Sequence, residues 1–131
     1  MYLLDTDTCI LITRGGPILD RLKQQGVDEV WISILTVYEL EVGVRKATLH
    51  PVQKRRALDD FLAMFAIAGF GMAEAREAAK IRAELEKAGT PIGATDYLIA
   101  GIARSHGWTL VTGNLHEFRR VKHLKSEQWH A

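Results

Sequence analysis

The sequence begins Met1-Tyr2-Leu3-Leu4-Asp5-Thr6-Asp7-Thr8, and this stretch decides the fold. A short apolar run is typical of a strand buried on both faces, and here it ends abruptly at two acidic residues separated by one threonine. Open α/β sheets build their sites at the carboxyl ends of parallel strands, where helices begin. We therefore expect Asp5 and Asp7 at the rim of a parallel sheet, with further polar groups gathered around them.

The bulk composition is typical of one globular domain, which we expect to span residues 1–131. The chain is 47% hydrophobic and 25% charged, and its length supports a sizeable core. No run approaches the roughly 18 to 20 apolar residues of a membrane span, and the first apolar run ends at Asp5 instead of continuing as a signal peptide. These features predict a cytoplasmic protein without a membrane segment. Cys9, the single cysteine, excludes an internal disulfide and has the apolar neighbours of a buried residue.

Strands and helices are predicted to alternate along the chain. The predicted strands cover residues 2–4, 30–33, 67–70, 108–112 and an edge strand over 121–124. The predicted helices cover residues 6–13, 18–25, 36–47, 51–65, 72–88 and 94–105, with one further turn capped by Asn114 and Glu117. Thr36 and Glu39 have the spacing of a capping box at the start of the third helix. Helical crossovers of this length suit a parallel sheet with helices on both faces.

Acidic or amide side chains follow several of the predicted strands and loops. Each also suits a helix cap or a first helical turn, but a parallel sheet would bring them to one rim. Two carboxylates about 5 Å apart repel by about 3 kcal/mol at an effective dielectric constant of 20, and a divalent cation removes that cost. Oxygen ligands suit Mg²⁺ or Mn²⁺, and the chemistry suggested is hydrolysis of a phosphodiester. The residues are Asp5, Asp7, Glu39, Asp96, Asn114 and Glu117.

Four blocks of the sequence, in order, resemble the signature blocks of PIN-domain ribonucleases, and most nearly those of the VapC toxins of bacterial toxin–antitoxin pairs. The resemblance covers essentially the whole chain and implies a three-layer α/β/α PIN-like domain with a central parallel sheet of four to five strands. It also implies a Mg²⁺-dependent endoribonuclease that forms a homodimer and is inhibited by a VapB-type antitoxin. The blocks are MYLLDTDTCI (1–10), SILTVYEL (33–40) with Gly43, IGATD (92–96) with Ile99-Ala100, and LVTGN (110–114) with Glu117-Phe118.

The same resemblance assigns roles to individual residues. The family's metal-binding acids fall on Asp5, Glu39 and Asp96, and its fourth acidic position falls on Asn114, which brings no charge. Asp7 stands where relatives usually have an amide, so this chain carries an extra carboxylate there. We expect one firmly bound Mg²⁺, with Mn²⁺ as a possible substitute, and leave a second ion open. Thr112 and Glu117 are expected to support the site.

The RNA and protein partners implied by the resemblance have candidate contact residues. Basic side chains close after the last block would steer an RNA backbone, and folded loops of tRNA, ribosomal RNA or messenger RNA are the expected targets. His116 lies nearby in sequence, but metal-assisted hydrolysis needs no general base. Protein partners have two candidate apolar surfaces, for which core packing is the alternative. The basic residues are Arg119, Arg120, Lys122 and Lys125, and the apolar sets are Trp31, Leu35, Tyr38 and Leu40, and Phe61, Met64 and Phe65.

Three other functions compete with this interpretation. The opening Asp5-Thr6-Asp7-Thr8 also resembles the start of a haloacid-dehalogenase phosphatase, but that class needs a later lysine and an acidic pair, and the block around Gly93 has one aspartate only. A response-regulator receiver needs an aspartate after its third strand, and residues 67–70 carry none. A PIN-like domain that binds RNA or a partner without cutting is favoured by the neutral Asn114 and opposed by the matched acids.

Overall fold

The computed structural model describes residues 1–129. Its strands are β1 (Tyr2–Leu4), β2 (Val30–Ser33), β3 (Ala66–Ala68), β4 (Thr109–Val111) and β5 (Lys125–Glu127). Its α-helices are α1 (Thr6–Thr13), α2 (Pro17–Gln25), α3 (Ile34–Lys46), α4 (Pro51–Leu62), α5 (Met72–Lys87), α6 (Ala94–His106) and α7 (Leu115–Phe118), and the short 3₁₀ helix η1 (Val27–Glu29) precedes β2.

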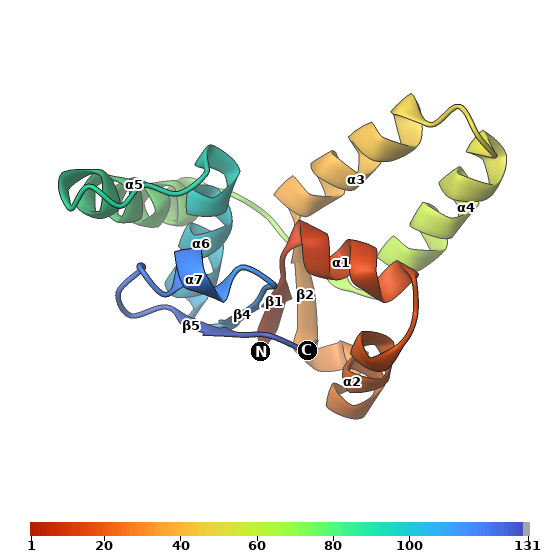
Figure 1. Cartoon of the computed structure of the whole chain (residues 1–131), viewed down its shortest axis with the longest axis horizontal. Helices are drawn as coiled ribbons and strands as arrows, with labels where there is room; N and C mark the ends of the chain where they lie inside the picture. The colour runs from red at the N-terminus through yellow and green to blue at the C-terminus, as the bar shows by residue number, and fades with distance from the viewer. Residues whose placement is uncertain (130–131) are drawn as a thin grey trace.

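The five strands form one parallel sheet in the order β3-β2-β1-β4-β5. The first strand of the sequence is therefore the central strand, where Leu3 is paired with Trp31 on one side and Leu110 on the other. Because all strands are parallel, their carboxyl ends lie at one rim, and Asp5 follows the end of β1 there. Figure 1 shows α5 and α6 on one side of the sheet and α1 and α2 on the other. The predicted three-layer α/β/α fold is confirmed.

Two apolar clusters hold the layers together. Leu3 belongs to the cluster under α5 and α6, and Leu4 belongs to the cluster under α1, α2 and α4. Neither side chain is exposed to solvent, because successive residues of a strand point to opposite faces and both faces are covered. This double burial is the reason that the opening strand is apolar throughout. Cys9 lies in the second cluster, as predicted, and burial raises the pKa of its thiol.

The packing of α6 on α5 depends on small residues. A Cβ atom at Gly101 would lie 2.7 Å from the Ala78 Cβ and 2.8 Å from the Ala78 backbone nitrogen. The two helix backbones therefore approach more closely than any larger residue at Gly101 would permit. Since α6 carries Asp96 at its first turn, this close packing also determines where that carboxylate lies.

The predicted capping box at the start of α3 is wrong. The helix begins at Ile34, and its cap is Ser33, whose Oγ accepts a hydrogen bond from the Thr36 backbone N–H at 3.0 Å. Strand β2 ends at Ser33, so strand and helix are joined without an intervening loop. The Glu39 side chain is consequently not used to close the start of its own helix, and it contacts Thr6 of α1 instead.

The predicted edge strand over 121–124 is also wrong, since β5 covers Lys125–Glu127 and pairs with β4. Val121 is buried in the core and Leu124 packs against it, so the apolar signal came from a loop that fills the core. An edge strand is hydrogen-bonded on one side only, and the side chains of Lys125-Ser126-Glu127 are exposed or half-buried, so this strand can be polar. Among the described residues, no helix combines the length and the apolar character that a membrane crossing requires.

Helix α4 is shorter than predicted, because it ends at Leu62 and the prediction extended it to residue 65. Phe61 and Phe65 both point into the core with ring centroids 5.0 Å apart, so the chain turns between them before β3.

Most of the residues predicted as possible contact surfaces for protein partners are packed on the core, and two are exposed. Trp31, Leu35, Leu40, Phe61 and Phe65 pack on the core, whereas Tyr38 is 68% exposed and Met64 is 47% exposed.

Candidate active site

Asp5 is placed by the end of the central strand. Its backbone N–H donates to the Val111 carbonyl at 3.0 Å, which holds it between β1 and β4. It is also the N-cap of α1, because its Oδ1 accepts a hydrogen bond from the Thr8 N–H at 2.9 Å. The residue is only 7% exposed. A buried carboxylate needs hydrogen-bond partners, and the start of α1 supplies one to Oδ1.

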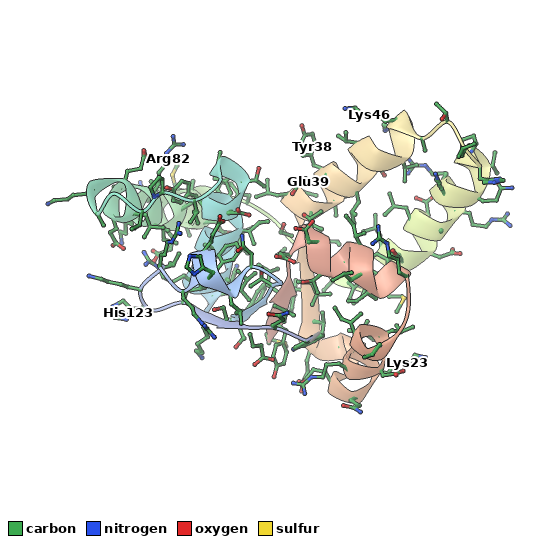
Figure 2. All side chains as sticks on the ribbon, viewed as in Figure 1. Lys23, Tyr38, Glu39, Lys46, Arg82 and His123 are labelled. Carbon is green, nitrogen blue, oxygen red and sulfur yellow. The ribbon has the colours of Figure 1, made fainter. Side chains whose placement is uncertain are left out.

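Glu39 approaches the same rim from α3. Figure 2 shows it near the sheet end of that helix, with Lys46 at the opposite end. Its Oε1 accepts a hydrogen bond from the Thr6 hydroxyl at 2.8 Å, across 33 positions of sequence. Thr6 is the first residue of α1, directly after Asp5. The hydrogen bond therefore links the second acid to the segment that carries the first.

Asp96 lies in the first turn of α6 and is half-buried. A Cβ atom at Gly93 would lie 3.0 Å from the Asp96 Oδ2, so the glycine allows the carboxylate to fold back over the start of the helix. The pKa of Asp96 is raised to about 6, first by burial and then by the negative charges of Glu117, Asp5, Glu39 and Asp7. The four acids that raise the pKa of Asp96 come from three other segments of the chain: the start of α1, α3 and α7.

A small cavity of about 80 Å³ opens between these acids. Of the residues predicted to form the site, Asp5, Glu39 and Asp96 line it, and so does Asp7, which is exposed in the first turn of α1. Three other residues line the cavity and were not predicted to belong to the site. Their only indication in the sequence is that they lie within three residues of a predicted acid. They are Thr6, Thr95 and Ile99.

The predicted supporting residues divide into two groups. Asn114 is exposed and Thr112 is fully buried, and neither lines the cavity. Thr112 Oγ1 accepts a hydrogen bond from the Asn114 N–H at 2.9 Å, and Asn114 precedes α7 without capping it through its side chain, contrary to the cap expected there. Glu117 is half-buried, and of the surrounding acids its charge raises the pKa of Asp96 most.

The donor set fits a hard divalent cation. The acids that line the cavity offer carboxylate oxygens, and the lining contains no sulfur or imidazole ligand, which suits Mg²⁺ or Mn²⁺. Burial and the neighbouring negative charges both raise the pKa of Asp96, so a bound cation would stabilise its ionised form. Among residues 1–129, however, no three His, Cys, Asp or Glu side chains lie close enough together to hold a metal ion as they stand. Small side-chain rotations or bridging waters are needed to complete a coordination sphere.

Residues 2–124 match the sequence model of a known family, described as "PIN domain". The chain belongs to the PIN-domain family. A relative from Shigella flexneri, named "tRNA(fMet)-specific endonuclease VapC", is 35% identical over 131 residues, which cover 98% of this chain and 97% of that protein. "Ribonuclease VapC2" of Haemophilus influenzae is 38% identical over 130 residues, with 98% and 97% of the two chains covered.

Solved structures give the same result for the fold. A chain in the crystal structure of DNA-bound VapBC from Salmonella typhimurium superposes on this PIN domain with a TM-score of 0.92 at 34% identity, and the match covers 98% of each chain. The resemblance inferred from the four sequence blocks is therefore confirmed by both kinds of comparison.

Beside the acidic cavity, the PIN domain has a larger apolar groove of about 560 Å³ between α1, α2, α3 and α4. Apolar side chains such as Ile10, Leu40 and Phe61 line it, and Thr6 and Glu39 belong to the lining of both the groove and the cavity. The groove therefore leads directly to the acidic site.

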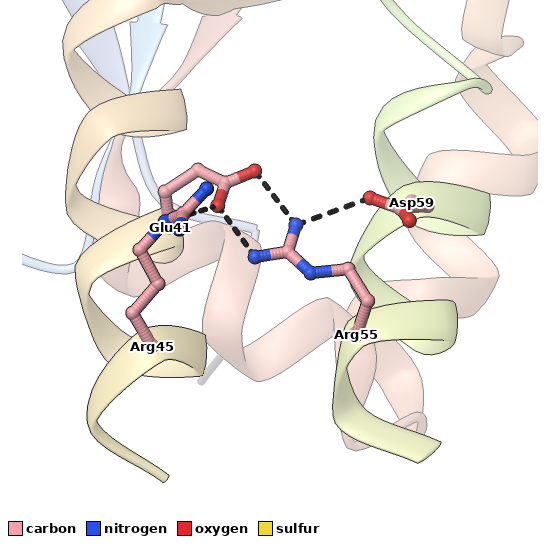
Figure 3. Close-up of polar contacts among 4 residues, drawn as sticks. All are labelled: Glu41, Arg45, Arg55 and Asp59. Atoms are coloured by element: carbon pink, nitrogen blue, oxygen red, sulfur yellow. Dashed lines mark hydrogen bonds and ion pairs between the residues drawn. The ribbon is translucent and has the colours of Figure 1, made fainter. Parts of the chain in front are cut away.

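An ion-pair cluster joins α3 to α4, two of the helices that form this groove (Figure 3). The Arg55 guanidinium donates two hydrogen bonds to Glu41, at 2.8 Å and 2.7 Å, and a third to Asp59 at 3.3 Å. The hydrogen bonds from Arg55 lower the pKa of Glu41, and Arg45 lies 3.4 Å from the same carboxylate. A paired guanidinium–carboxylate contact has a defined geometry, so it holds the two helices at a set separation.

The basic residues predicted to contact RNA differ in their surroundings. Arg119, Lys122 and Lys125 are exposed. Arg120 is half-buried, and its guanidinium donates to the Pro91 carbonyl at 3.1 Å, in the loop that leads to Asp96. Arg120 thus stabilises the loop before α6. His116 is exposed on α7 and does not line the cavity.

Proposed function

We propose that this PIN domain is the toxin of a type II toxin–antitoxin pair and acts as a Mg²⁺-dependent endoribonuclease. The observation that carries the proposal is the convergence of Asp5, Glu39 and Asp96 on one cavity, where burial and then the neighbouring negative charges raise the pKa of Asp96 to about 6. Such crowding destabilises the metal-free protein, and a bound cation would reverse it. The relatives named as VapC ribonucleases support the same activity.

Roles for individual residues follow from their contacts. Asp5, Glu39 and Asp96 would hold Mg²⁺, or Mn²⁺ in its place, and the cation when bound supplies an activated water and neutralises charge on the phosphate. Asp5 is oriented by the Thr8 N–H, and Glu39 by the Thr6 hydroxyl. The other predicted members have outer roles: Asp7 and Glu117 add negative charge, Thr112 positions the Asn114 backbone, and the exposed Asn114 side chain is available to substrate or water.

The substrate would be RNA, approaching with its backbone along the exposed basic residues Arg119, Lys122 and Lys125. Such contacts position a phosphate backbone without reading sequence. Because the Shigella flexneri relative is named for tRNA(fMet), initiator tRNA is the first substrate to test, with ribosomal and messenger RNA loops beside it.

The antitoxin would occupy the apolar groove between α1, α3 and α4. The groove leads to Glu39, so an amphipathic segment lying in it could place a basic side chain at the acidic cavity and so block the active site. The complex with antitoxin in the Salmonella typhimurium structure supports this type of partner. The homodimer implied by the family remains a prediction, with the exposed Tyr38 as a candidate contact.

The deciding experiment measures cleavage of a panel of structured RNAs with Mg²⁺, with EDTA, and with the Asp96→Asn variant. We expect cleavage only with Mg²⁺ and the native chain, and Asp28→Asn serves as a matched control because Asp28 is exposed in η1. Cleavage that survives both EDTA and Asp96→Asn would refute a metal-dependent nuclease.

The second candidate function is an RNA-binding or partner-binding PIN domain that does not cut. It is favoured by the neutral, exposed Asn114 and by the absence, among the described residues, of three side chains already arranged to hold a metal. The same panel separates the two functions. RNA that binds the native chain with Mg²⁺ but stays intact would favour the second.

A further inference from the structure

A series of hydrogen-bonded side-chain hydroxyl groups, here called the hydroxyl chain, connects the interior of the fold to Glu39. Ser33 Oγ lies 3.4 Å from Thr36 Oγ1, which lies 3.1 Å from Thr6 Oγ1, and the Thr6 hydroxyl donates to the Glu39 Oε1 at 2.8 Å. Ser33 and Thr36 are fully buried, and Thr6 is half-buried. The four residues come from the end of β2, from α3 and from α1, so the hydroxyl chain also joins three elements.

The direction of the hydrogen bonds follows from counting protons. A hydroxyl has one proton to donate, and the Thr6 proton is directed at Glu39, since an ionised carboxylate can only accept. Thr6 must therefore accept from Thr36, whose proton is used in turn, so Thr36 accepts from Ser33. All three protons point toward the Glu39 carboxylate. Hydrogen bonds arranged in this way polarise one another and strengthen the last one.

The first member of the hydroxyl chain is held in place by the backbone. Ser33 Oγ accepts a hydrogen bond from the Thr36 N–H at 3.0 Å, which is the N-cap of α3. The cap fixes the side chain of Ser33, and through Thr36 it fixes the position of the Thr6 oxygen. The N-cap of α3 inside the fold thus influences the position of the Glu39 carboxylate at the rim.

We propose that Thr6 is a positioning residue for Glu39 and that Ser33 and Thr36 act through it, an inference that rests on the proposed metal-dependent function. Thr6 and Glu39 line both the acidic cavity of about 80 Å³ and the apolar groove of about 560 Å³. Without the Thr6 hydroxyl, the Glu39 carboxylate can turn toward the wider groove. With it, Oε1 is held on the α1 side and Oε2 remains available to a cation.

The contact itself is tested in the metal-free protein by a double-mutant cycle. Urea unfolding of the native chain, Thr6→Val, Glu39→Ala and the double variant, all in EDTA, gives the coupling free energy between the two side chains, because each single substitution removes one partner of the hydrogen bond. We expect the double variant to lose less stability than the sum of the single variants. Additive losses would show that Thr6 and Glu39 do not interact, and would overturn the proposal whether or not the protein is a nuclease.

The consequence is tested by calorimetric titration with Mn²⁺ and by the Mg²⁺ dependence of RNA cleavage. Outer hydrogen-bond partners of metal ligands typically change affinity by about 10-fold to 100-fold, so we expect Thr6→Val to weaken Mn²⁺ binding by about tenfold and Thr6→Ser to restore it. Cleavage by Thr6→Val should recover at high Mg²⁺. The matched control is Thr13→Val, because Thr13 belongs to the same helix and its hydroxyl donates to the Ile10 carbonyl, away from Glu39.

The outcomes separate the inference from the proposed function. If the native chain binds Mn²⁺ and Thr6→Val binds it equally well, the positioning role is refuted and the nuclease proposal stands. If Thr6→Ser fails to restore the affinity, side-chain volume and not the hydroxyl matters, which also overturns the inference. If the native chain neither binds Mn²⁺ nor cleaves RNA, the proposed function fails, and the positioning role toward a cation fails with it.

Discussion

Replacing Asp96 by asparagine should make the metal-free protein more stable at neutral pH, although it removes a residue of the active site. The pKa of this carboxyl is raised from 3.8 to about 6 by burial and by the surrounding acids. For a fully buried group a rise of that size corresponds to about 3 kcal/mol. Asp96 is half-buried, so solvent screening reduces the value to about 1.5 kcal/mol. The lost interaction with the α6 dipole, about 0.5 kcal/mol, leaves a net gain of about 1 kcal/mol.

The stability difference between Asp96→Asn and the native chain depends on pH. Because the folded pKa of Asp96 lies above the unfolded value, its stabilising contribution is fully present below pH 3.8 and is lost as the pH rises through about 6. The asparagine variant has no such loss. We therefore expect it to match the native chain near pH 3.5 and to exceed it at pH 7.5. A gain of about 1 kcal/mol corresponds to a rise in Tm of about 3 to 5 °C for a domain of this size.

The assay is thermal unfolding at pH 3.5 and pH 7.5 in EDTA, with Asp28→Asn as the control for replacement of an exposed aspartate. Adding Mg²⁺ at pH 7.5 should then raise the Tm of the native chain and not that of Asp96→Asn, because only the native chain would bind the ion. An unchanged or lower Tm for Asp96→Asn at pH 7.5 in EDTA would show that the carboxylate is not crowded, and the electrostatic argument for a cation site would fall.

Three further predictions follow from neighbouring features. Glu117→Gln should lower the pKa of Asp96 toward its ordinary value, because Glu117 is the acid that raises it most, and an NMR titration of the metal-free protein would show this. Gly101→Ala should destabilise the fold by about 1 to 3 kcal/mol, because the new Cβ would clash with the backbone of α5. Gly43→Ala in α3 should stabilise the fold by about 0.5 to 1 kcal/mol, because no atom lies within 4 Å of the new Cβ. Urea unfolding compares the two variants, and equal effects would contradict the packing argument. Cys9 should react with a thiol reagent only after unfolding, because burial raises its pKa and blocks access.

The groove proposed for the antitoxin adjoins the acidic cavity proposed for catalysis. The groove and the cavity share Thr6 and Glu39. A segment bound in the groove would therefore also lie next to the acidic site. The Arg55–Glu41 contact holds α4 against α3 and so preserves the groove in the absence of an occupant. A groove formed in advance lowers the ordering cost of binding on the toxin side.

The sequence by itself determined the elements and the acids. The apolar run before Asp5, the helices and the parallel arrangement all follow from local periodicity and crossover length, which depend on residues near one another in the chain. Asp5, Glu39 and Asp96 were predicted because each lies at or near the start of a helix that follows a strand or loop. The parallel arrangement already suggested a shared cation site at one rim, and the family resemblance selected these three acids as the metal ligands.

Only the tertiary structure decided which of these groups meet. The strand order β3-β2-β1-β4-β5 places Asp5 at the centre of the rim, and it brings Glu117 close enough to be the acid that affects the pKa of Asp96 most. The capping-box spacing predicted that Glu39 would serve its own helix, yet Ser33 caps α3 and Glu39 bonds to Thr6 across 33 positions. The physical reason is that a helix cap has several equivalent local solutions, and long-range packing selects the one that leaves the carboxylate at the site.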